Sequence, residues 1–343
     1  MMESYFDAVK FELGLFSTQD VVSSIYIGGG TPGYVPARYI ESVMKTIRKK
    51  FSIARGCEVS IEVNPGSVTD EKLRIYKAAG INRISMGMQA TQNELLKRIG
   101  RTHDLDDIKK AVDLIDGVGF ENFNLDMMFS LPGQTIKDVE ETALFAVQSG
   151  ATHISAYSLI LEENTPINQL YKDNVYVQND ELDRQMYHRV SDILTFCGYD
   201  RYEISNFAVP GFECRHNLYC WDFCDYLGVG AAAHSFVADM RYVNTPNLEE
   251  YITKVYQNAH NTLEQTETKE ELIEDYIMLA FRKTSGLKVK DFESRFGVDF
   301  EKTYEKELGK LTEEGLLLRT ENGFALTEKG CDFESAVVRE FFF

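Results

Sequence analysis

The chain has few basic residues for its size and no long hydrophobic run. It contains 36 Lys and Arg against 54 Asp and Glu, which gives a net charge of −18 over 343 residues. Affinity for nucleic acids depends largely on cationic neutralisation of phosphates, so this charge balance argues against a nucleic-acid partner. No apolar stretch approaches the ~20 residues that a transmembrane helix needs. The first residues also lack the basic and apolar regions of a signal peptide, and we therefore expect a cytoplasmic protein.

Cysteine is also sparse, with six residues in the whole chain. Cys57, Cys197 and Cys331 are each isolated in the sequence. A disulfide framework requires many cysteines at close spacing in a short secreted chain, and this sequence has neither property. The composition therefore predicts reduced thiols.

The other three cysteines, Cys214, Cys220 and Cys224, follow the spacing C-x5-C-x3-C, and His216 lies near the first of them. Thiolates and imidazoles are ligands of zinc and of iron–sulfur clusters. Thiols that are partly buried and act as small hydrophobic side chains also explain the pattern. We favour this second interpretation and keep Cys214, Cys220, Cys224 and His216 as weak metal-site candidates.

The chain does contain a regular alternation of short apolar strands and amphipathic helices. Helices are predicted near residues 5–15, 36–51, 69–79, 105–118 and 135–149, and a short apolar strand follows each of them. Alternation of this length predicts right-handed parallel βαβ units and an α/β fold. The hydrophobic content of 44% is sufficient for a packed core.

Polar residues follow successive predicted strands, at the point where each strand ends. These residues are the glycine-rich turn 28–32, Glu62, Gln89, Asp126 and Tyr157. In a barrel of alternating strands and helices the ligand lies at the carboxyl ends of the strands, so these residues predict one shared pocket. Taken singly, a triple glycine indicates only a tight turn, and a lone carboxylate or Arg101 indicates a surface group. Their common position favours the pocket.

The last part of the chain changes character. Helices are predicted at 270–283, 289–296 and 300–314, followed by strands at 316–319 and 323–326, which is typical of a winged-helix-like α+β domain. Glu and Asp are dense where a DNA-recognition helix would carry Lys and Arg, so we expect this domain to pack against protein. The predicted domains are 1–165, a partial barrel; 166–262, a helix and an aromatic and glycine-rich segment that packs on the barrel; and 263–343.

Several long motifs occur in order along the chain: 28–32 (GGGTP), 62–65 (EVNP), 82–89 (NRISMGMQ), 100–103 (GRTH) and 124–135 (NLDMMFSLPGQT). Together they closely resemble the radical S-adenosylmethionine (SAM) enzymes related to oxygen-independent coproporphyrinogen III oxidase. The later blocks 202–208 (YEISNFA), 213–217 (ECRHN) and 226–231 (YLGVGA) resemble the heme-chaperone branch of that family, HemW. The resemblance covers nearly the whole chain and implies a partial (βα)6 radical-SAM-type barrel.

The resemblance also implies cofactors and the residues that bind SAM. The backbone of Gly29, Gly30 and Thr31 would approach the methionine end of SAM, which glycine permits because it has no Cβ. Glu62 would accept hydrogen bonds from the ribose hydroxyls or the ammonium group. Heme is the second expected ligand, with a [4Fe–4S] cluster expected for the family.

Three further residues complete the implied SAM pocket. Gln89 and Asp126 would make polar contacts around the ribose and the methionine. Arg101 would pair with the carboxylate, because a planar guanidinium matches a carboxylate in a bidentate fashion. No residue is assigned a catalytic role.

The sequence departs from the family at its beginning. The family binds its cluster through a C-x3-C-x2-C loop that follows the first strand, and no such loop is present, since the first cysteine is Cys57. We therefore expect a barrel that lacks its first strand and its cluster site, through either a late start codon or a real loss. We favour the late start.

Three functions follow as hypotheses. The first is a heme chaperone that binds heme or a porphyrin together with SAM and delivers heme to an unidentified acceptor protein, with association at a membrane surface left open. The second is the radical SAM oxidative decarboxylation of coproporphyrinogen III, for which the missing cluster would be required. The third is an inactive fragment or a descendant that only binds a partner.

Overall fold

The computed structural model describes residues 1–163, 165–173, 175–177, 179–265 and 268–342. The chain divides into two compact units. The barrel unit comprises Asp20–Arg201 and Ser205–Cys214, and the second unit comprises Met1–Gln19, Tyr202–Ile204 and Arg215–Phe343. These units do not follow the predicted boundaries at 165 and 262. The N-terminal helix α1 (Met2–Leu15) groups with the second unit because it packs against α10 (Leu248–Val255).

The barrel unit is built on a curled sheet with the strand order β1-β2-β3-β4-β5-β7-β6. Neighbouring strands from β1 to β5 pair in parallel, as the sequence predicts. The parallel strands are β1 (Val21–Ile27), β2 (Ser52–Val63), β3 (Arg83–Gln89), β4 (Phe123–Phe129) and β5 (His153–Ser158). The predicted α/β partial barrel is therefore confirmed. Two short antiparallel strands, β6 (Asp200–Arg201) and β7 (Asn206–Ala208), extend it.

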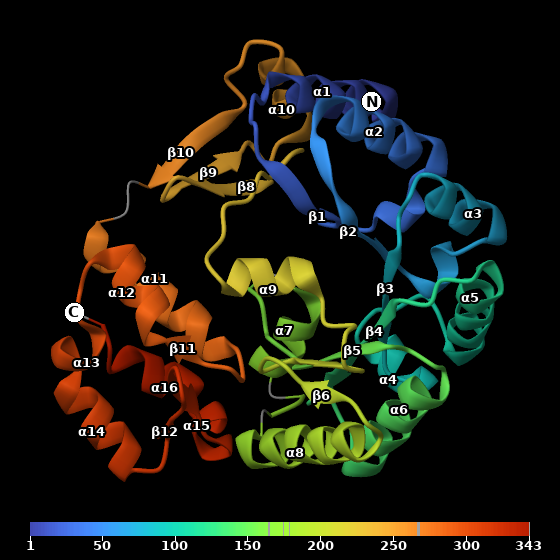
Figure 1. Ribbon diagram of the computed structural model, residues 1–343. Helices are drawn as coiled ribbons and strands as arrows, with labels where there is room; N and C mark the ends of the chain where they lie inside the picture. The colour runs from blue at the N-terminus through green and yellow to red at the C-terminus, as the bar shows by residue number, and fades with distance from the viewer. Residues whose placement is uncertain (164, 174, 178, 266–267, 343) are drawn as a thin grey trace. The chain divides into compact units, whose positions relative to one another are not determined.

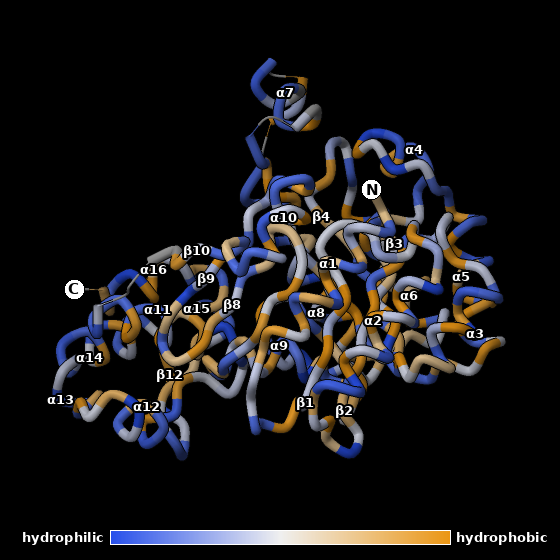
Figure 2. The backbone as a smooth tube through the Cα atoms, turned by 90° about the horizontal axis from the view of Figure 1, so that it is seen from above, coloured by the Kyte–Doolittle hydropathy of each residue, from blue (hydrophilic) through white to orange (hydrophobic). Residues whose placement is uncertain are grey.

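Amphipathic helices connect the parallel strands and lie along their outer side (Figure 1). They are α2 (Ala37–Lys50), α3 (Asp70–Ala78), α5 (Leu105–Val118) and α6 (Ile136–Gln148), close to the predicted ranges. The helix starts have a local cause: the side chains of Thr69, Asp104 and Thr135 each accept a hydrogen bond from a backbone N–H in the first turn. Polar and apolar residues alternate along α3 and α5, as Figure 2 shows.

Shorter helical segments complete the barrel unit. They are the 3-10 turns η1 (Pro32–Tyr34) and η2 (Pro65–Ser67) and the helices α4 (Asn93–Arg98), α7 (Pro166–Lys172) and α8 (Asp180–Phe196). The helix predicted near residues 179–196 is confirmed as α8, which packs against β5 and α6. Among the described residues, no helix is both long and apolar enough to cross a membrane.

The two faces of the parallel sheet differ sharply in polarity. Ile84, Met86 and Met88 of β3 are fully buried on one face, whereas Arg83 and Ser85 point to the other. The strand register continues this division, because residues paired across parallel strands share a face. Strands in parallel sheets are usually apolar on both faces, so the polar inner face of this half-barrel indicates a functional surface.

The second unit contains a small antiparallel sheet and a helical C-terminal module. The small sheet has the order β10-β9-β8, formed by β8 (His234–Val237), β9 (Met240–Asn244) and β10 (Asn261–Gln265), with α9 (Arg215–Trp221) before it in the chain. The module contains α11 (Lys269–Arg282), α12 (Val289–Phe296), α13 (Phe300–Thr303), α14 (Glu305–Glu313), α15 (Glu328–Asp332) and α16 (Glu334–Arg339).

The predicted two-stranded wing of this module is formed by β12 (Leu317–Arg319) and β13 (Gly323–Leu326). A third short strand, β11 (Leu287–Lys288), pairs with β13 and was not predicted. The helix predicted at 300–314 is interrupted at Tyr304, which separates α13 from α14. Buried aromatic side chains, Phe281, Phe292, Phe300 and Phe341, fill the core of the module.

Candidate functional site

The turn after β1 has the geometry of a site where a ligand meets the backbone. A Cβ built on Gly28 would lie 2.9 Å from Glu62 Cδ and 2.8 Å from Tyr26 Cε1, so only glycine leaves room for these side chains. Gly29 and Gly30 have φ angles of 79° and 121°. A Cβ on either of them would meet no protein atom within 4 Å. Glycine is therefore required at these two positions by the positive φ angles and not by crowding, and the space beside the turn is empty of protein atoms.

Glu62 lies beside this turn at the end of β2. It is half-buried and accepts a hydrogen bond from Tyr26 Oη, with 2.9 Å between that oxygen and Glu62 Oε1. Burial raises the pKa of Tyr26, and the nearby carboxylates of Glu62 and Asp126 add to this effect. Glu62 and Asp126 therefore act on the same hydroxyl group, as expected for strand ends that share one pocket.

Asp126, on β4, has an unusual ionisation. Burial raises its pKa to about 6, and the negative charge of Glu62 contributes in the same direction. A hydrogen bond from Asn124 Nδ2, at 2.6 Å from Asp126 Oδ1, a hydrogen bond from Ser155 and the positive charge of Arg83 oppose this rise. A half-buried carboxyl that titrates near neutral pH is typical of a functional site.

Gln89 is held in a strained turn at the end of β3. Its φ angle is 71°, and Ala90 N donates to Met88 O at 3.0 Å, which is the pattern of a γ-turn. The Gln89 side chain is buried and accepts a hydrogen bond from Tyr157 Oη, with 3.2 Å between the two oxygens. Strained backbone conformations persist only where surrounding contacts hold them, and they are common at functional sites.

Arg101 reaches the same region from the segment after α4. Burial raises the pKa of Tyr157 and Asp126 adds to this rise, whereas the hydrogen bond to Gln89 and the positive charge of Arg101 lower it. Arg101 is half-buried, so its guanidinium remains accessible to an anionic group. The cation that the sequence assigns to a ligand carboxylate therefore lies near the other predicted residues.

Thr31 is fixed by a neighbour that the sequence interpretation did not include among the site residues. Its Oγ1 accepts a hydrogen bond from Asn64 Nδ2 at 3.2 Å. Lys72 Nζ donates to Gly33 O at 2.5 Å and ties the same segment to α3. The structure thus brings together the strand-end cluster: Gly29, Gly30, Thr31, Glu62, Gln89, Arg101 and Asp126.

The sequence assigns no role to two side chains of this cluster, Tyr26 in an apolar strand and Asn64 in the motif 62–65. Tyr157, which its place at a strand end predicts for the shared pocket, lies beside Gln89. These residues orient Glu62, Thr31 and Gln89 respectively.

The weak metal candidates do not form a metal site. Cys214 is fully buried in the barrel unit and its Sγ donates to Glu58 Oε1 at 3.5 Å. Cys220 lies on α9 and Cys224 follows it in the second unit, where burial and their mutual proximity raise the pKa of the Cys220 thiol. Within the described ranges, no three His, Cys, Asp or Glu side chains are arranged to hold a metal ion. None of the six cysteines, all of which are described, forms a disulfide.

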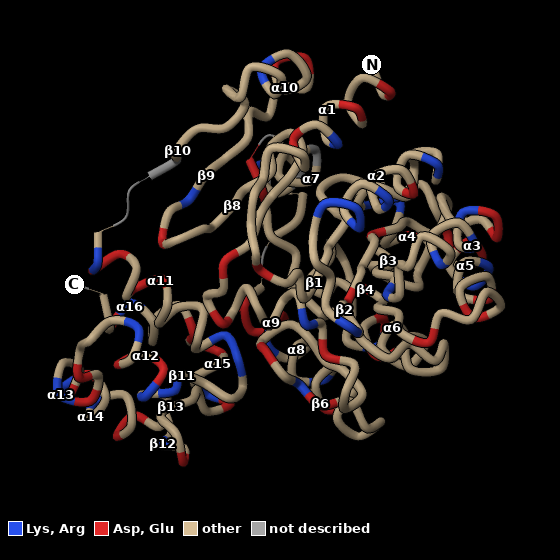
Figure 3. The backbone as a smooth tube through the Cα atoms, turned by 45° about the horizontal axis from the view of Figure 1, so that its top comes forward, with Lys and Arg blue, Asp and Glu red and all other residues tan. Residues whose placement is uncertain are grey.

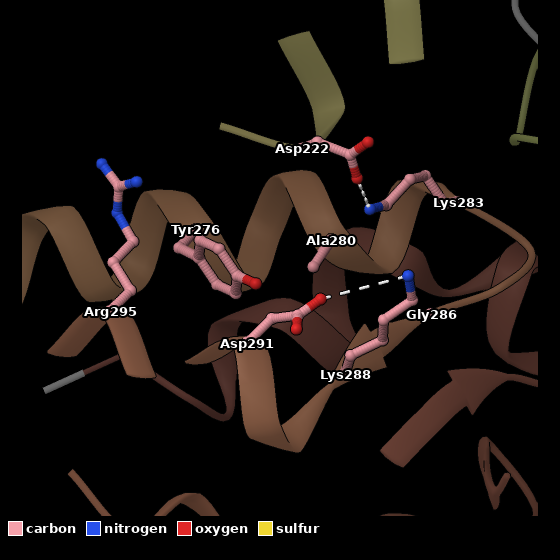
Figure 4. A pocket seen from close by; sticks show the side chains of 8 residues that line it. All are labelled: Asp222, Tyr276, Ala280, Lys283, Gly286, Lys288, Asp291 and Arg295. Carbon is pink, nitrogen blue, oxygen red and sulfur yellow. Dashed lines mark hydrogen bonds and ion pairs between the residues drawn. The ribbon is translucent and has the colours of Figure 1, made fainter. Parts of the chain in front are cut away.

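The second unit contains a cavity of about 290 Å³, shown in Figure 4. Three cations line it, but each has a carboxylate partner. Lys283 pairs with Asp222, Arg295 pairs with Asp239, and Lys288 Nζ lies 4.0 Å from an Asp291 oxygen. These ion pairs balance the charge, so the cavity does not have the character of an anion site. Figure 3 shows Lys and Arg interspersed with Asp and Glu over α13 and α14.

Family models and known relatives match this chain over most of its length. Residues 7–146 match the model of the radical SAM superfamily, and residues 268–333 match the HemN C-terminal domain. The chain is 33% identical to the heme chaperone HemW of Lactococcus lactis, over 99% of this chain and 89% of the relative. It is 36% identical to the protein of the same name from Bacillus subtilis, over 91% of this chain and 83% of the relative.

The chain belongs to the HemW family. The HemW of Escherichia coli is also similar, at 30% identity over 93% of this chain and 84% of its own length. Among solved structures, the radical SAM enzyme coproporphyrinogen III oxidase (HemN) from Escherichia coli has the same fold, with a TM-score of 0.83 and 23% identity over 99% of this chain and 82% of that one. The predicted membership of the radical SAM family, in its HemW branch, is confirmed.

Proposed function

We propose that the chain is a heme chaperone that binds SAM at the strand-end cluster and passes heme to an acceptor protein. The observation that carries this proposal is that the predicted SAM residues at the carboxyl ends of β1 to β3 lie near Asp126 of β4 and Arg101 after α4, in a chain that matches curated heme chaperones over nearly its whole length. The chemistry of the cluster suits the ligand. SAM presents an ammonium group, a carboxylate, a ribose diol and an adenine.

Each group of SAM has a complementary residue in the cluster. Glu62 and Asp126 supply carboxylate acceptors for the ammonium group and the ribose hydroxyls. Arg101 supplies a cation for the ligand carboxylate. The peptide groups at Gly29 and Gly30 are exposed, with open space beside them for the methionine end. When bound beside an iron–sulfur cluster, SAM supplies an adenosyl radical in this superfamily.

The residues present do not fit an iron–sulfur cluster. Such clusters are held by several thiolates at one place, and no suitable grouping occurs in the part of the chain that the structure describes. We therefore assign no step that passes through a cluster, and the proposed role rests on binding.

Heme binding requires an accessible iron ligand, and imidazole is a common one. In the second unit, His216 is half-buried and His234 is exposed, whereas His260 is buried against Glu12. His216 and His234 are therefore the histidines of this unit that can reach a ligand as large as heme.

The test is a titration of the purified chain with hemin, followed by the Soret absorption band. We expect a saturable shift of the Soret band for the wild-type chain and its loss in His216→Ala, His234→Ala or the double variant. His188→Ala, an exposed histidine of the barrel unit, is the matched control. Absence of a saturable shift in the wild-type chain would contradict a heme chaperone.

Coproporphyrinogen III oxidation is the second candidate, favoured by the shared fold with HemN. An assay for decarboxylated product from coproporphyrinogen III separates the two functions. Heme binding without product supports the chaperone. Product formation would support the oxidase, and a chain that shows neither property would support a fragment that only binds a partner.

A further inference from the structure

A buried row of polar side chains lies behind Asp126 on the inner face of the half-barrel. Asn124 and His153 are 1% and 0% exposed. Asn124 Oδ1 accepts from His153 Nδ1 at 2.7 Å and from Ser155 Oγ at 3.2 Å. Asn124 Nδ2 donates to Ser85 Oγ at 2.9 Å and to Asp126 Oδ1 at 2.6 Å. The Asn124 amide thus makes all four hydrogen bonds available to it.

The orientation of the Asn124 amide follows from its partners. An ionised Asp126 can only accept hydrogen bonds, so the nitrogen of the amide must face it and the oxygen must face His153. His153 therefore donates from Nδ1. Burial, together with the positive charge of Arg83, lowers the pKa of His153 well below its ordinary value, so the ring is neutral. A neutral histidine with a fixed tautomer thereby locks the direction of the Asn124 amide.

We propose that Asn124, locked by His153, is the positioning residue that aims Asp126 into the strand-end cluster and keeps it able to accept hydrogen bonds from a ligand. This inference deepens the proposed SAM site and rests on it. Asn124 is two residues before Asp126 on the same strand, and its Nδ2 fixes the position of Asp126 Oδ1.

The charges around Asp126 explain why such a residue is needed. Burial and the neighbouring Glu62 favour the protonated carboxyl, which would offer fewer acceptor positions to an ammonium or ribose group. Hydrogen bonds from Asn124 and Ser155 and the positive charge of Arg83 favour the ionised form, and Asn124 makes the largest of these contributions. The titratable and charged groups that influence Asp126 or its neighbour Tyr157 are Tyr26 on β1, Glu62 on β2, Arg83 on β3, Tyr157 on β5 and Arg101 after α4.

The test combines two measurements on the wild-type chain and on Asn124→Leu. The first follows the titration of the Asp126 carboxyl carbon by NMR in selectively labelled, ligand-free protein, with Asp126→Asn used to assign the signal. Loss of the Asn124 hydrogen bond should raise the pH at which Asp126 ionises by about one unit. The second measures SAM affinity by calorimetry between about pH 5.5 and 9. The affinity of Asn124→Leu should fall only about twofold near pH 7 but about eightfold near pH 5.5, and it should recover at higher pH, because binding follows the ionised fraction of Asp126 and a shift of one pKa unit changes that fraction by a full factor of ten only below both pKa values.

Ser85→Ala is the matched control, because it removes one hydrogen bond from the same amide and leaves the bond to Asp126 intact. It should keep the wild-type titration and affinity within about twofold. Asn124→Ala leaves space for a water molecule and replaces Asn124→Leu if that variant does not fold. An unchanged Asp126 titration in the Asn124 variant, or an affinity loss equal at every pH, would overturn the inference. If the wild-type chain does not bind SAM, the proposed function fails, and the ligand-free titration still decides the role of Asn124.

Discussion

Asp126 lies on a strand whose opposite face packs into the core, and its own carboxyl is half-buried beside Glu62. Its pKa is raised to about 6, so the folded state holds the proton more tightly than the unfolded chain does. Protonated Asp126 therefore contributes to the free energy of unfolding at low pH. This contribution is lost as the pH rises through about 6, where the buried carboxyl ionises. The ionised form of Asp126 that would bind a ligand is therefore the form that makes the folded protein less stable.

Asp126→Asn should make the protein more stable at neutral pH and weaken SAM binding. We expect a gain of about 1–2 kcal/mol in the free energy of unfolding near pH 8, because the amide removes the penalty of an ionised, half-buried carboxyl. The gain should disappear below about pH 4, where the carboxyl is protonated in both states. Denaturant unfolding at several pH values measures it. A variant that is less stable than wild type at pH 8 would contradict the assigned ionisation.

At this scale the sequence predicts the ends of strands better than their interiors. Glu62 and Gln89 follow apolar residues and lie where β2 and β3 end, whereas Asp126, predicted at a strand end, lies in the middle of β4. Asn124 and His153 were not assigned a role, because they lie within strands that the sequence analysis treated as buried core. The signal was present in the alternation of polar and apolar residues, since a buried parallel strand with one polar face must line an interior surface.

The N-terminal helix α1 is joined to the rest of the second unit by one buried carboxylate. Glu12 is 1% exposed, and its Oε2 accepts from Gly230 N at 2.8 Å and from Tyr251 Oη at 2.6 Å. Its Oε1 accepts from Asn244 Nδ2 at 2.7 Å and from His260 Nε2 at 2.9 Å. Four segments distant in sequence thus meet on a single side chain, which fixes the position of α1 in this unit.

Glu12→Gln should destabilise the second unit strongly. The amide nitrogen would face hydrogen-bond donors, and a buried network with one mismatched member loses about 3 kcal/mol. Asp7→Asn on the same helix is the control, because Asp7 makes a partly exposed ion pair with Lys10 and should cost less than about 0.5 kcal/mol. Chemical denaturation monitored by circular dichroism makes the comparison. Equal stability of the two variants would show that Glu12 does not anchor α1.

Elements with a clear hydrophobic period were predicted close to their observed bounds, including α2, α5, α6 and α8. The sheet of β8, β9 and β10 was not predicted as a sheet. The side chains described in its strands are mostly half-buried or exposed and include many polar ones, so the pairing of these strands depends on contacts between distant segments such as Asn244 and Asn261. The six-residue helix α4 is too short for a periodic signal and was also missed.

On the scale of the whole molecule, the charge and the site have separate origins. The net charge of −18 is the excess of Asp and Glu over Lys and Arg, and exposed ion pairs, which are neutral and of little energetic value, add nothing to it. The strand-end cluster instead combines two carboxylates with Arg101 in a region enclosed by the half-barrel. The acidic composition therefore argues against a nucleic-acid partner, whereas the order of strands and motifs is what indicates SAM as the ligand.

Calorimetric titration of the purified chain with SAM tests this account most directly. We expect one saturable site with an affinity weaker than micromolar, because the pocket residues are present and the described residues supply no iron–sulfur cluster to chelate the ligand. Arg101→Ala should weaken binding by about tenfold through loss of a charge-assisted hydrogen bond. Cys220→Ala, outside the cluster, should bind as the wild type does. No detectable binding to the wild-type chain, or equal affinities for wild type and Arg101→Ala, would contradict the assignment of the strand-end cluster as the SAM site.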